Sequence, residues 1–291
     1  MGENSVLHYS ILDPTGNLTA LVEDAVETAR QPAVAAALMR RHPQVEQVGF
    51  LRRLPAGEDA QAALRMAGGE FCGNAAMSAA ALLLSQRGQA AGEVRLRVSG
   101  AAAPVSLRLQ AAGAGAYLAG ITMPPALEIC ERDFAFGPLR ATLPLVRMEG
   151  ISHLLIGQDC AFFALLRERP AAEQAVRTLC QTLGADGLGL LFLTGAGDAR
   201  EMTPLVYVPG SGTCFWESAC ASGSAAVGMA LAKKTGAATA LDLREPGGTL
   251  RVLCDPAGET RLCGRVRLLA RQAVPKAALW TENGENFSES C

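Results

Sequence analysis

The sequence predicts an α+β fold built from two similar halves, and three observations lead to that prediction. A cysteine followed by small residues and an alanine-rich helical pattern occurs twice, at Cys72 and at Cys220. Strand and helix patterns recur in the same order around each cysteine, which is the signature of an internal repeat. Most other segments alternate polar and apolar residues with the period of half-buried strands.

Each half is expected to begin with a strand, a helix and a second strand. The expected strands are residues 16–22 and 45–54 in the first half, and residues 150–156 and 188–194 in the second. A proline opens each expected helix: the helix after Pro32 ends near Arg41, and the helix after Pro170 ends near Leu183. Proline suits the first helical position because the N–H that it lacks has no helical partner there.

The two cysteine-bearing segments continue into helices with ordinary stop signals. The helix after Cys72 is expected to run to Leu84 and stop at Gly88, and the helix after Cys220 to run to Ala232 with Gly236 just beyond. Further strands are expected at residues 94–98, 105–109, 240–243, 249–253 and 261–268.

The two halves are expected to join near Met123–Pro125. Residues 1–124 would then form an N-terminal lobe that carries Cys72, and residues 125–291 a C-terminal lobe that carries Cys220. Beyond Val274 the chain turns polar, with residues 285–288 and Cys291 near its end, and this tail is expected to fray or to pack back on the N-terminal lobe.

Composition excludes several classes of protein. The chain of 291 residues is 49% hydrophobic and 19% charged with a net charge of −2, which gives no electrostatic basis for binding nucleic acid or an anionic membrane. We expect no signal peptide and no membrane span, because the apolar runs are short. The nine cysteines lack metal-binding spacing and the three histidines lie far apart, so neither a zinc site nor a disulfide framework is expected. This composition is typical of a cytoplasmic protein.

The two cysteines could form an acid–base pair. A thiol at a helix N-terminus lies among unpaired N–H groups at the positive end of the helix dipole, which favours the thiolate. The same N–H groups can hold a substrate carboxylate. Either cysteine alone would more readily be explained as a small buried apolar residue, but the repeated context favours a shared function.

The chain resembles the diaminopimelate epimerase-like superfamily of cofactor-independent amino-acid racemases and epimerases. Within it, the chain is most similar to the histidine racemases that serve synthesis of staphylopine-type metallophores. The resemblance covers nearly the whole chain and is carried by the segments Asp13–Thr19, Glu46–Phe50, Gly69–Asn74, Pro204–Pro209, Trp216–Cys220 and Pro246–Gly248.

The resemblance implies two pseudo-symmetric lobes, each a curled, mostly antiparallel sheet around a central helix. It implies that one cysteine thiolate takes the α-proton of the substrate while the other thiol delivers a proton to the opposite face, with Cys72 and Cys220 in these roles. It places Gly73, Asn74, Ala221 and Ser222 at the two helix ends that hold the substrate, and Asn17 and Gln47 near its amine or carboxylate. No cofactor and no metal are implied, and relatives suggest a homodimer.

Departures from the family indicate the substrate. Diaminopimelate epimerase grips a second amino-acid head with an arginine-containing loop before the second cysteine and with two asparagines. Here that loop is Trp216–Ala219 without arginine, Met66 stands where one asparagine is expected, and the matching turn reads Gly150–His153. We therefore reject diaminopimelate as the preferred substrate and expect histidine.

Several further side chains were weighed for a substrate role. Glu217 and Glu46 are expected to contact the substrate, since a carboxylate beside the site can hold an amine or an imidazole N–H. For Glu70 a helix-capping role and a substrate role are equally supported. His153 is expected to be structural. Tyr207 and Trp216 could line a pocket for an aromatic side chain, although burial alone would explain both.

Two other interpretations stay open at this point. The first is a racemase or epimerase for another amino acid, whether of broad specificity or specific for diaminopimelate or a hydroxyproline-like substrate. The second, ranked below it, is a non-catalytic amino-acid-binding protein or a redox switch built from the cysteine pair.

Overall fold

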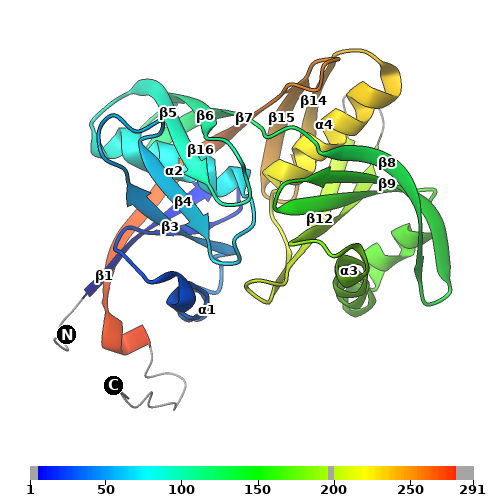
Figure 1. Ribbon diagram of the computed structural model, residues 1–291, viewed down its shortest axis with the longest axis horizontal. Helices are drawn as coiled ribbons and strands as arrows, with labels where there is room; N and C mark the ends of the chain where they lie inside the picture. Colours follow the sequence, from blue (N-terminus) through cyan, green and yellow to red (C-terminus); the bar gives the residue numbers. More distant parts are fainter. Residues whose placement is uncertain (1–5, 196–199, 280–291) are drawn as a thin grey trace.

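The computed structural model describes residues 6–195 and 200–279 (Figure 1). Within these residues, sixteen strands form one continuous sheet that is joined and covered by helices, so the predicted mixture of sheet and helix is confirmed. The strands are β1 (Val6–Pro14), β2 (Thr19–Val22), β3 (Gln47–Arg53), β4 (Ala62–Met66), β5 (Ala91–Val98), β6 (Val105–Ala111), β7 (Ala116–Thr122), β8 (Glu128–Phe136), β9 (Leu139–Met148), β10 (Ile151–Gly157), β11 (Leu188–Thr194), β12 (Arg200–Val208), β13 (Thr213–Trp216), β14 (Thr239–Glu245), β15 (Gly248–Cys254) and β16 (Thr260–Pro275). The α-helices are α1 (Gln31–Arg41), α2 (Gly73–Gln86), α3 (Arg169–Leu183) and α4 (Ala221–Thr235), and the 3₁₀ helices are η1 (Thr28–Arg30), η2 (Ala161–Arg167) and η3 (Lys276–Leu279).

A closed barrel forms the first part of the molecule. Strands β1 to β7 pair in chain order, β7 pairs with β16, and β16 returns to pair with β1, so that these eight described strands leave no open edge. Helix α2 contacts all eight of them. Every residue from Gly73 to Leu84 is buried, and a helix that is apolar on all sides must lie inside.

The second part of the sheet continues from the same long strand, β16. It runs through β15, β14, β12, β11, β10 and β9 to β8, and α4 packs against β9, β10, β14, β15 and β16. Helix α3 contacts β8, β11 and β12 around a separate apolar cluster (Figure 1). The helices α2 and α4 share one continuous apolar core, so the two parts of the molecule are not separately packed units.

The same series of strand pairings occurs in both parts. In the barrel, β1–β2 is antiparallel, β2–β3 parallel, β3–β4 antiparallel, β4–β5 parallel, and β5–β6 and β6–β7 antiparallel. The series β9–β10, β10–β11, β11–β12, β12–β14, β14–β15 and β15–β16 repeats this order. In the barrel, α2 follows β4, the second strand of the antiparallel pair β3–β4. In the second part, α4 follows β12, the second strand of the antiparallel pair β11–β12, with only the short β13 between them.

Glycines allow the two parts to meet. A Cβ added to Gly16 would lie 2.4 Å from the Cα of Gly247, so the turn before β2 and the turn between β14 and β15 approach at backbone distance.

Glycines also end two helices. Gly184 and Gly236 end α3 and α4 with φ of 60° and 66°, the left-handed conformation that glycine adopts without a steric penalty.

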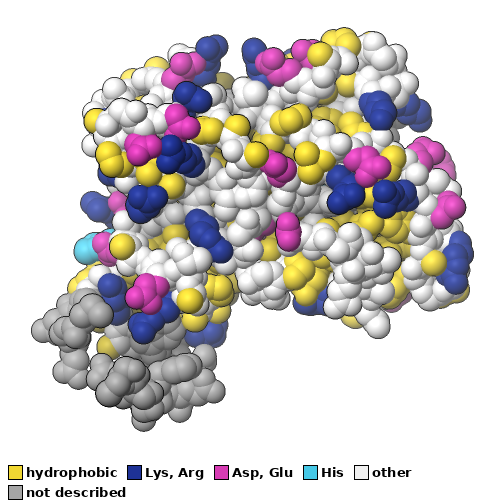
Figure 2. Space-filling view, viewed as in Figure 1, with side chains coloured by type: hydrophobic (Ala, Val, Ile, Leu, Met, Phe, Trp, Pro, Cys, Tyr) yellow, Lys and Arg dark blue, Asp and Glu magenta, His cyan; other side chains and the backbone are white. Residues whose placement is uncertain are grey.

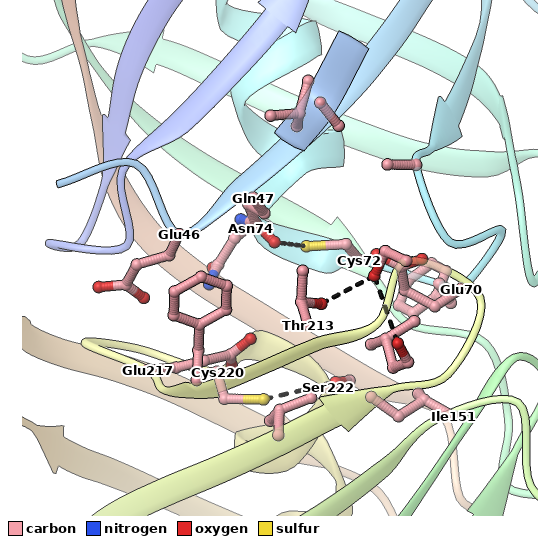
Figure 3. Close-up of a pocket in the computed structure, with 18 of the residues that line it drawn as sticks. Glu46, Gln47, Glu70, Cys72, Asn74, Ile151, Thr213, Glu217, Cys220 and Ser222 are labelled. Carbon is pink, nitrogen blue, oxygen red and sulfur yellow. Dashed lines mark hydrogen bonds between the residues drawn. The ribbon is translucent and has the colours of Figure 1, made fainter. Parts of the chain in front are cut away.

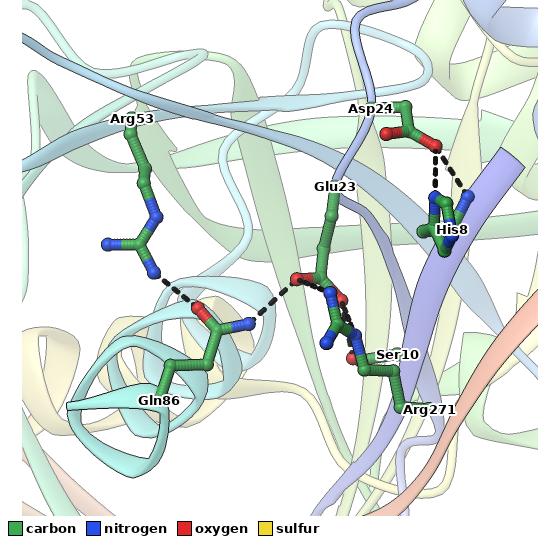
Figure 4. A network of polar contacts seen from close by, with 7 residues as sticks. All are labelled: His8, Ser10, Glu23, Asp24, Arg53, Gln86 and Arg271. Carbon is green, nitrogen blue, oxygen red and sulfur yellow. Dashed lines mark hydrogen bonds and ion pairs between the residues drawn. The ribbon is translucent and has the colours of Figure 1, made fainter. Parts of the chain in front are cut away.

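A polar network ties the barrel seam to the end of α2 (Figure 4). Glu23 follows β2, and its carboxylate accepts hydrogen bonds from Ser10 Oγ at 2.8 Å and from Gln86 Nε2 at 2.7 Å. The Nε of Arg271 on β16 lies 3.3 Å from the same carboxylate. One side chain therefore links β1, β16 and α2 at the place where the barrel closes.

The surface carries no field of a single sign on the face shown in Figure 2. Acidic and basic side chains are interspersed over it, in agreement with the small net charge. In the described part of the chain, no helix is both long enough and apolar enough to cross a membrane.

The expected helices and the expected strands of each half are present within three residues of their predicted bounds, except that β16 runs on to Pro275 instead of ending at residue 268. Not predicted were β1, β7, β12 and the β8–β9 hairpin. The chain leaves the barrel between β7 and β8, the segment that contains Met123–Pro125, although the division into lobes at residues 124 and 125 stays a prediction. The segment 285–288 and Cys291 lie outside the described residues.

Truncation inside the barrel tests the position of α2. Leu83 is fully buried, so Leu83→Ala should lower the free energy of unfolding by about 2–5 kcal/mol, through lost burial and a residual cavity. Leu118 on β7 is 53% exposed, and the matched control Leu118→Ala should change it by no more than about 0.5 kcal/mol. Urea unfolding followed by circular dichroism measures both. Equal effects would contradict a buried α2.

Candidate active site

The N-terminal ends of α2 and α4 meet in the middle of the molecule. A Cβ added to Gly73, the first residue of α2, would lie 2.9 Å from the Cβ of Ala221, the first residue of α4. Glycine at position 73 therefore allows this approach. Cys72 and Cys220 are the N-cap residues of the two helices, so the contact brings both thiols to one place.

Cys72 is held by the start of its own helix and by one amide. Its sulfur accepts a hydrogen bond from the N–H of Ala75 at 3.4 Å, and its thiol donates to Gln47 Oε1 at 2.8 Å. The Gln47 amide is oriented in turn, because its Nε2 donates to Thr19 Oγ1 at 2.8 Å and to Asn17 Oδ1. Gln47 thus directs an acceptor oxygen at the thiol.

Cys220 has a different set of partners. Its sulfur accepts from the N–H of Gly223 at 3.4 Å and lies 3.6 Å from Ser222 Oγ. Ser222 Oγ is 3.0 Å from His153 Nε2, and burial lowers the pKa of His153 to about 3, so this histidine is neutral. The backbone N–H of Cys220 donates to Glu245 at 2.6 Å, which places a carboxyl group at the N-terminus of α4, and burial raises the pKa of this group.

The two cysteines line one cavity of about 110 Å³ (Figure 3). Three glutamates, Glu46, Glu70 and Glu217, share its lining with them. Among the described residues that line it, none is lysine, arginine or histidine. A cavity with this lining favours a ligand that brings positive charge or hydrogen-bond donors.

The carboxyl groups are shifted toward their neutral forms. Burial raises the pKa of Glu217 to about 8, the neighbouring Cys220 thiol opposes the shift, and the nearby Glu46 and Glu70 add to it. Burial also raises the pKa of Glu46 and of Glu70. Desolvation by burial, which penalises the charged form, is the first cause of all three shifts.

The thiols are shifted as well, and here the structure corrects the expectation from the sequence. Burial raises the pKa of both Cys72 and Cys220 above the ordinary range, and the charge of Glu217 raises both further. The helix N–H groups act in the predicted direction, but they are outweighed. Both thiols are therefore protonated at neutral pH in the free protein.

Two side chains of the barrel reach across to the second part of the molecule. The Glu46 carboxylate accepts hydrogen bonds from Asn17 Nδ2, from the N–H of Ser218 at 3.0 Å and from the Ser218 hydroxyl. Asn74 Nδ2 donates to the carbonyl of Ala219 at 2.8 Å. The loop that leads to Cys220 is thus fixed from the barrel side.

The structure brings nearly all of the sequence-predicted site residues together. Those that line the cavity are Cys72, Cys220, Glu46, Gln47, Gly73, Asn74, Glu217, Ala221 and Ser222. Asn17 is fully buried behind this wall, where its amide contacts Glu46, Gln47 and Asn74. Its predicted contact with substrate stays a prediction, and the structure gives it a supporting position.

The aromatic residue that lines the cavity differs from the two that the sequence suggested. Tyr207 and Trp216 do not line the cavity; Arg177 stacks on Tyr207 and Arg169 on Trp216, both from α3. Phe215 lines the cavity instead. The sequence could have predicted this, because side chains alternate between the two faces of a strand. Thr213, Phe215 and Glu217 are spaced two residues apart along β13 and its continuation, so they point to the same face.

Other lining residues were not singled out from the sequence. They are mostly apolar and come from α1, β10 and β12, namely Pro32, Ala35, Ala36, Met39, Ile151, Val206 and Val208, together with Ser211. Such residues give no local signal, because each would be explained equally well by an ordinary apolar core.

Comparison with known proteins assigns the chain to a family. The sequence matches the family described as the histidine racemase CntK N-terminal domain over residues 6–271. The chain belongs to this family. A histidine racemase of Fusobacterium nucleatum subsp. nucleatum is 27% identical over 277 residues, which cover 92% of this chain and 96% of that one. A histidine racemase of Staphylococcus aureus strain Mu50 is 27% identical over 274 residues, with 91% and 96% covered.

Solved structures agree on the fold. A probable proline racemase from Agrobacterium radiobacter K84 matches with a TM-score of 0.65 and 18% identity over 92% of each chain. A hydroxyproline epimerase from Agrobacterium vitis matches with a TM-score of 0.65 and 14% identity over 93% of each chain. The racemase- and epimerase-like fold and the isomerase class predicted from the sequence are confirmed.

The shift of Glu217 should appear in the pH dependence of stability. Its pKa is about 8 in the folded protein against an ordinary 4.5, so the folded state holds a proton that the unfolded chain releases. Stability from this group is lost as pH rises from about 4.5 to about 8. Glutamine does not titrate, so Glu217→Gln does not lose this stability as the pH rises. The melting temperature of the variant should therefore exceed that of wild type by a difference that grows between about pH 4.5 and about pH 8 and is constant above it.

Melting curves by differential scanning fluorimetry across pH test this expectation. The exposed Glu201→Gln is the matched control, because Glu201 lies outside the cavity in an ion pair with Arg244. Its difference from wild type should not follow the same pH profile. A Glu217→Gln margin that is constant with pH would contradict the assignment.

Proposed function

We propose that the protein is an amino-acid racemase that interconverts L- and D-histidine, with Cys72 and Cys220 as paired acid and base and without pyridoxal phosphate. The observation that carries the proposal is that two thiols, each at the N-terminus of a buried helix, line one cavity. Racemisation needs a base on one face of the α-carbon and an acid on the other. The α-proton is a very weak acid, so a site without an electron sink must rely on placement and on N–H dipoles.

The helix ends supply the site for the α-carboxylate. The first N–H groups of an α-helix have no partner within the helix, and they favour an anion. In this proposal the N–H groups around Gly73 and Asn74 on α2, and around Ala221 and Ser222 on α4, hold the carboxylate and stabilise the charge that develops beside it.

The acidic groups of the cavity receive the α-ammonium. Glu217 and Glu46 line the cavity, and Asn74 Oδ1 is buried with no hydrogen-bond partner among the described residues. Asn17 acts through Gln47 and Asn74, which it contacts. An ammonium beside these carboxyl groups offsets their negative charge. Because that charge contributes to the raised pKa of the thiols, the pKa of each thiol falls. Substrate therefore favours the thiolate that the free protein disfavours.

The proton balance closes over one turnover. One cysteine, as thiolate, takes the α-proton and becomes a thiol, while the other thiol gives its proton to the opposite face and becomes a thiolate. Reversing the direction exchanges the two roles, so no proton is gained or lost. The proton that leaves when the first thiolate forms passes to solvent, because burial keeps Glu217 protonated at neutral pH in the free protein.

The same lining argues against diaminopimelate. That substrate carries a second carboxylate, and the described lining offers no cationic side chain to pair with it. Histidine brings an ammonium and a ring N–H instead.

The fold belongs to the proposal too: two lobes related by pseudo-symmetry, divided near residue 124, are supported by the repeated order of strand pairings. A homodimer, a cytoplasmic location and a role in metallophore synthesis stay predictions.

Replacing either cysteine should abolish racemisation. Cys72→Ser and Cys220→Ser should each lower the rate by roughly 10²–10⁴-fold, because each removes a group that transfers a proton to or from carbon. Cys130→Ser is the control, since Cys130 lies on β8 away from the cavity. The assay uses reduced protein without pyridoxal phosphate and follows D-histidine by chiral chromatography. A Cys72→Ser protein with wild-type rate would defeat the two-thiol assignment.

A substrate panel in D₂O separates the alternatives. Each common L-amino acid, hydroxyproline and diaminopimelate are incubated in turn, and deuterium at the α-carbon is followed by NMR. Exchange confined to histidine supports the proposal. Exchange with other amino acids keeps the mechanism and replaces the substrate. No exchange with any of them, despite tight binding or reversible disulfide formation, supports a binding protein or redox switch.

A further inference from the structure

The three glutamates of the cavity differ in how far their oxygen atoms are already used. Both oxygens of Glu46 accept hydrogen bonds from Ser218, and one also accepts from Asn17. Glu70 is less fully used: its buried Oε2 has no hydrogen-bond partner among the described residues, and backbone N–H groups of Glu70 and Gly68 are the donors that act on its carboxyl. A carboxyl at a cavity wall that no side-chain donor satisfies is open to a donor supplied by the ligand.

Glu70 lies on the Cys72 side of the cavity (Figure 3). Ser211 and Thr213, whose hydroxyls are 2.8 Å apart, also line the cavity there. This wall is rigid, because the turn at Gly210 packs at backbone distance on Gly68: a Cβ at Gly210 would lie 2.3 Å from the carbonyl oxygen of Gly68. The position of the Glu70 carboxyl is therefore fixed before a ligand arrives.

The surroundings of Glu70 suit a flat ring with a polar edge. Apolar side chains from β10, β12 and β13 line the same cavity, namely Ile151, Val206, Val208 and Phe215. They can contact the faces of an imidazole ring, while the carboxyl accepts a hydrogen bond from its N–H edge. An aliphatic side chain would leave Glu70 unpaired.

We propose that Glu70 is a specificity-determining residue that accepts a hydrogen bond from a ring N–H of the substrate imidazole, which leaves Glu217 to the α-ammonium. This inference rests on the proposed histidine racemase activity and names the side-chain subsite of the same cavity. The residue selects against amino acids that lack a side-chain donor, because a site built to receive a hydrogen bond rejects a ligand that cannot give one.

The test combines Glu70→Leu, which removes every acceptor oxygen, with histidine methylated at one or the other ring nitrogen. In wild type, methylation of the nitrogen that contacts Glu70 should raise KM about tenfold or more, with a smaller change in kcat. Glu70→Leu should raise KM for L-histidine by a similar factor. If the two changes remove the same hydrogen bond, methylation should cost little more in Glu70→Leu.

Independent effects would overturn the proposal. A full methylation penalty that persists in Glu70→Leu, or an unchanged KM in that variant, means that Glu70 does not contact the ring. Glu201→Gln is the surface control and should match wild type throughout. Glu70→Ala, which also removes every acceptor, is judged by the same criteria where Glu70→Leu does not fold by circular dichroism.

Failure of the proposed function is recognised separately. If wild type exchanges no α-proton of histidine, Glu70 is judged by titration with imidazole itself, followed by ligand-observed NMR. Weaker binding of imidazole to Glu70→Leu than to wild type, by about tenfold, supports the subsite. Equal binding to the two proteins, or no binding to wild type, overturns it.

Discussion

The structure depends on the contact between the N-terminal ends of α2 and α4. Each helix is buried in its own part of the sheet, and the close approach at Gly73 and Ala221 decides where the two N-caps lie. The long strand β16 pairs with β1, β7 and β15, so it joins the two parts around this point. A larger residue at position 73 would separate the helix ends and with them the two thiols, whatever the rest of the fold retained.

In the free protein, the electrostatics of the site keeps both cysteines in the unreactive thiol form. Burial and the neighbouring carboxyl groups keep Cys72 and Cys220 protonated, although each sulfur accepts an N–H hydrogen bond at its helix start. The argument from sequence considered the helix dipole, which acts over one turn, and not the cost of removing water, which acts on the whole group. Reactivity then depends on what enters the cavity, and in the proposed function the α-ammonium of the substrate changes the balance that the protein alone sets.

Local patterns were sufficient for the helices and for most strands. Proline at the start of α1 and α3, and glycine after α3 and α4, predicted bounds that the structure reproduces within three residues. The barrel closure could not be predicted, because β1 pairs with β16 at the far end of the sequence and no local signal records that partner. Glu245 was missed for the same reason: it gives the N-terminus of α4 a carboxylate from a strand 25 residues away in the chain.

The distribution of unsatisfied polar atoms connects the fold to its ligand. Four buried side-chain atoms lack a hydrogen-bond partner among the described residues, on Glu70, Asn74, Ser78 and His153. Glu70 and Asn74 line the cavity, and His153 lies directly behind Ser222, which lines it too. A core selected for stability alone would not gather its unpaired acceptors at one cavity. Under the proposed function, the stability lost at Glu70 and Asn74 is recovered as binding energy when the substrate supplies hydrogen-bond donors to them.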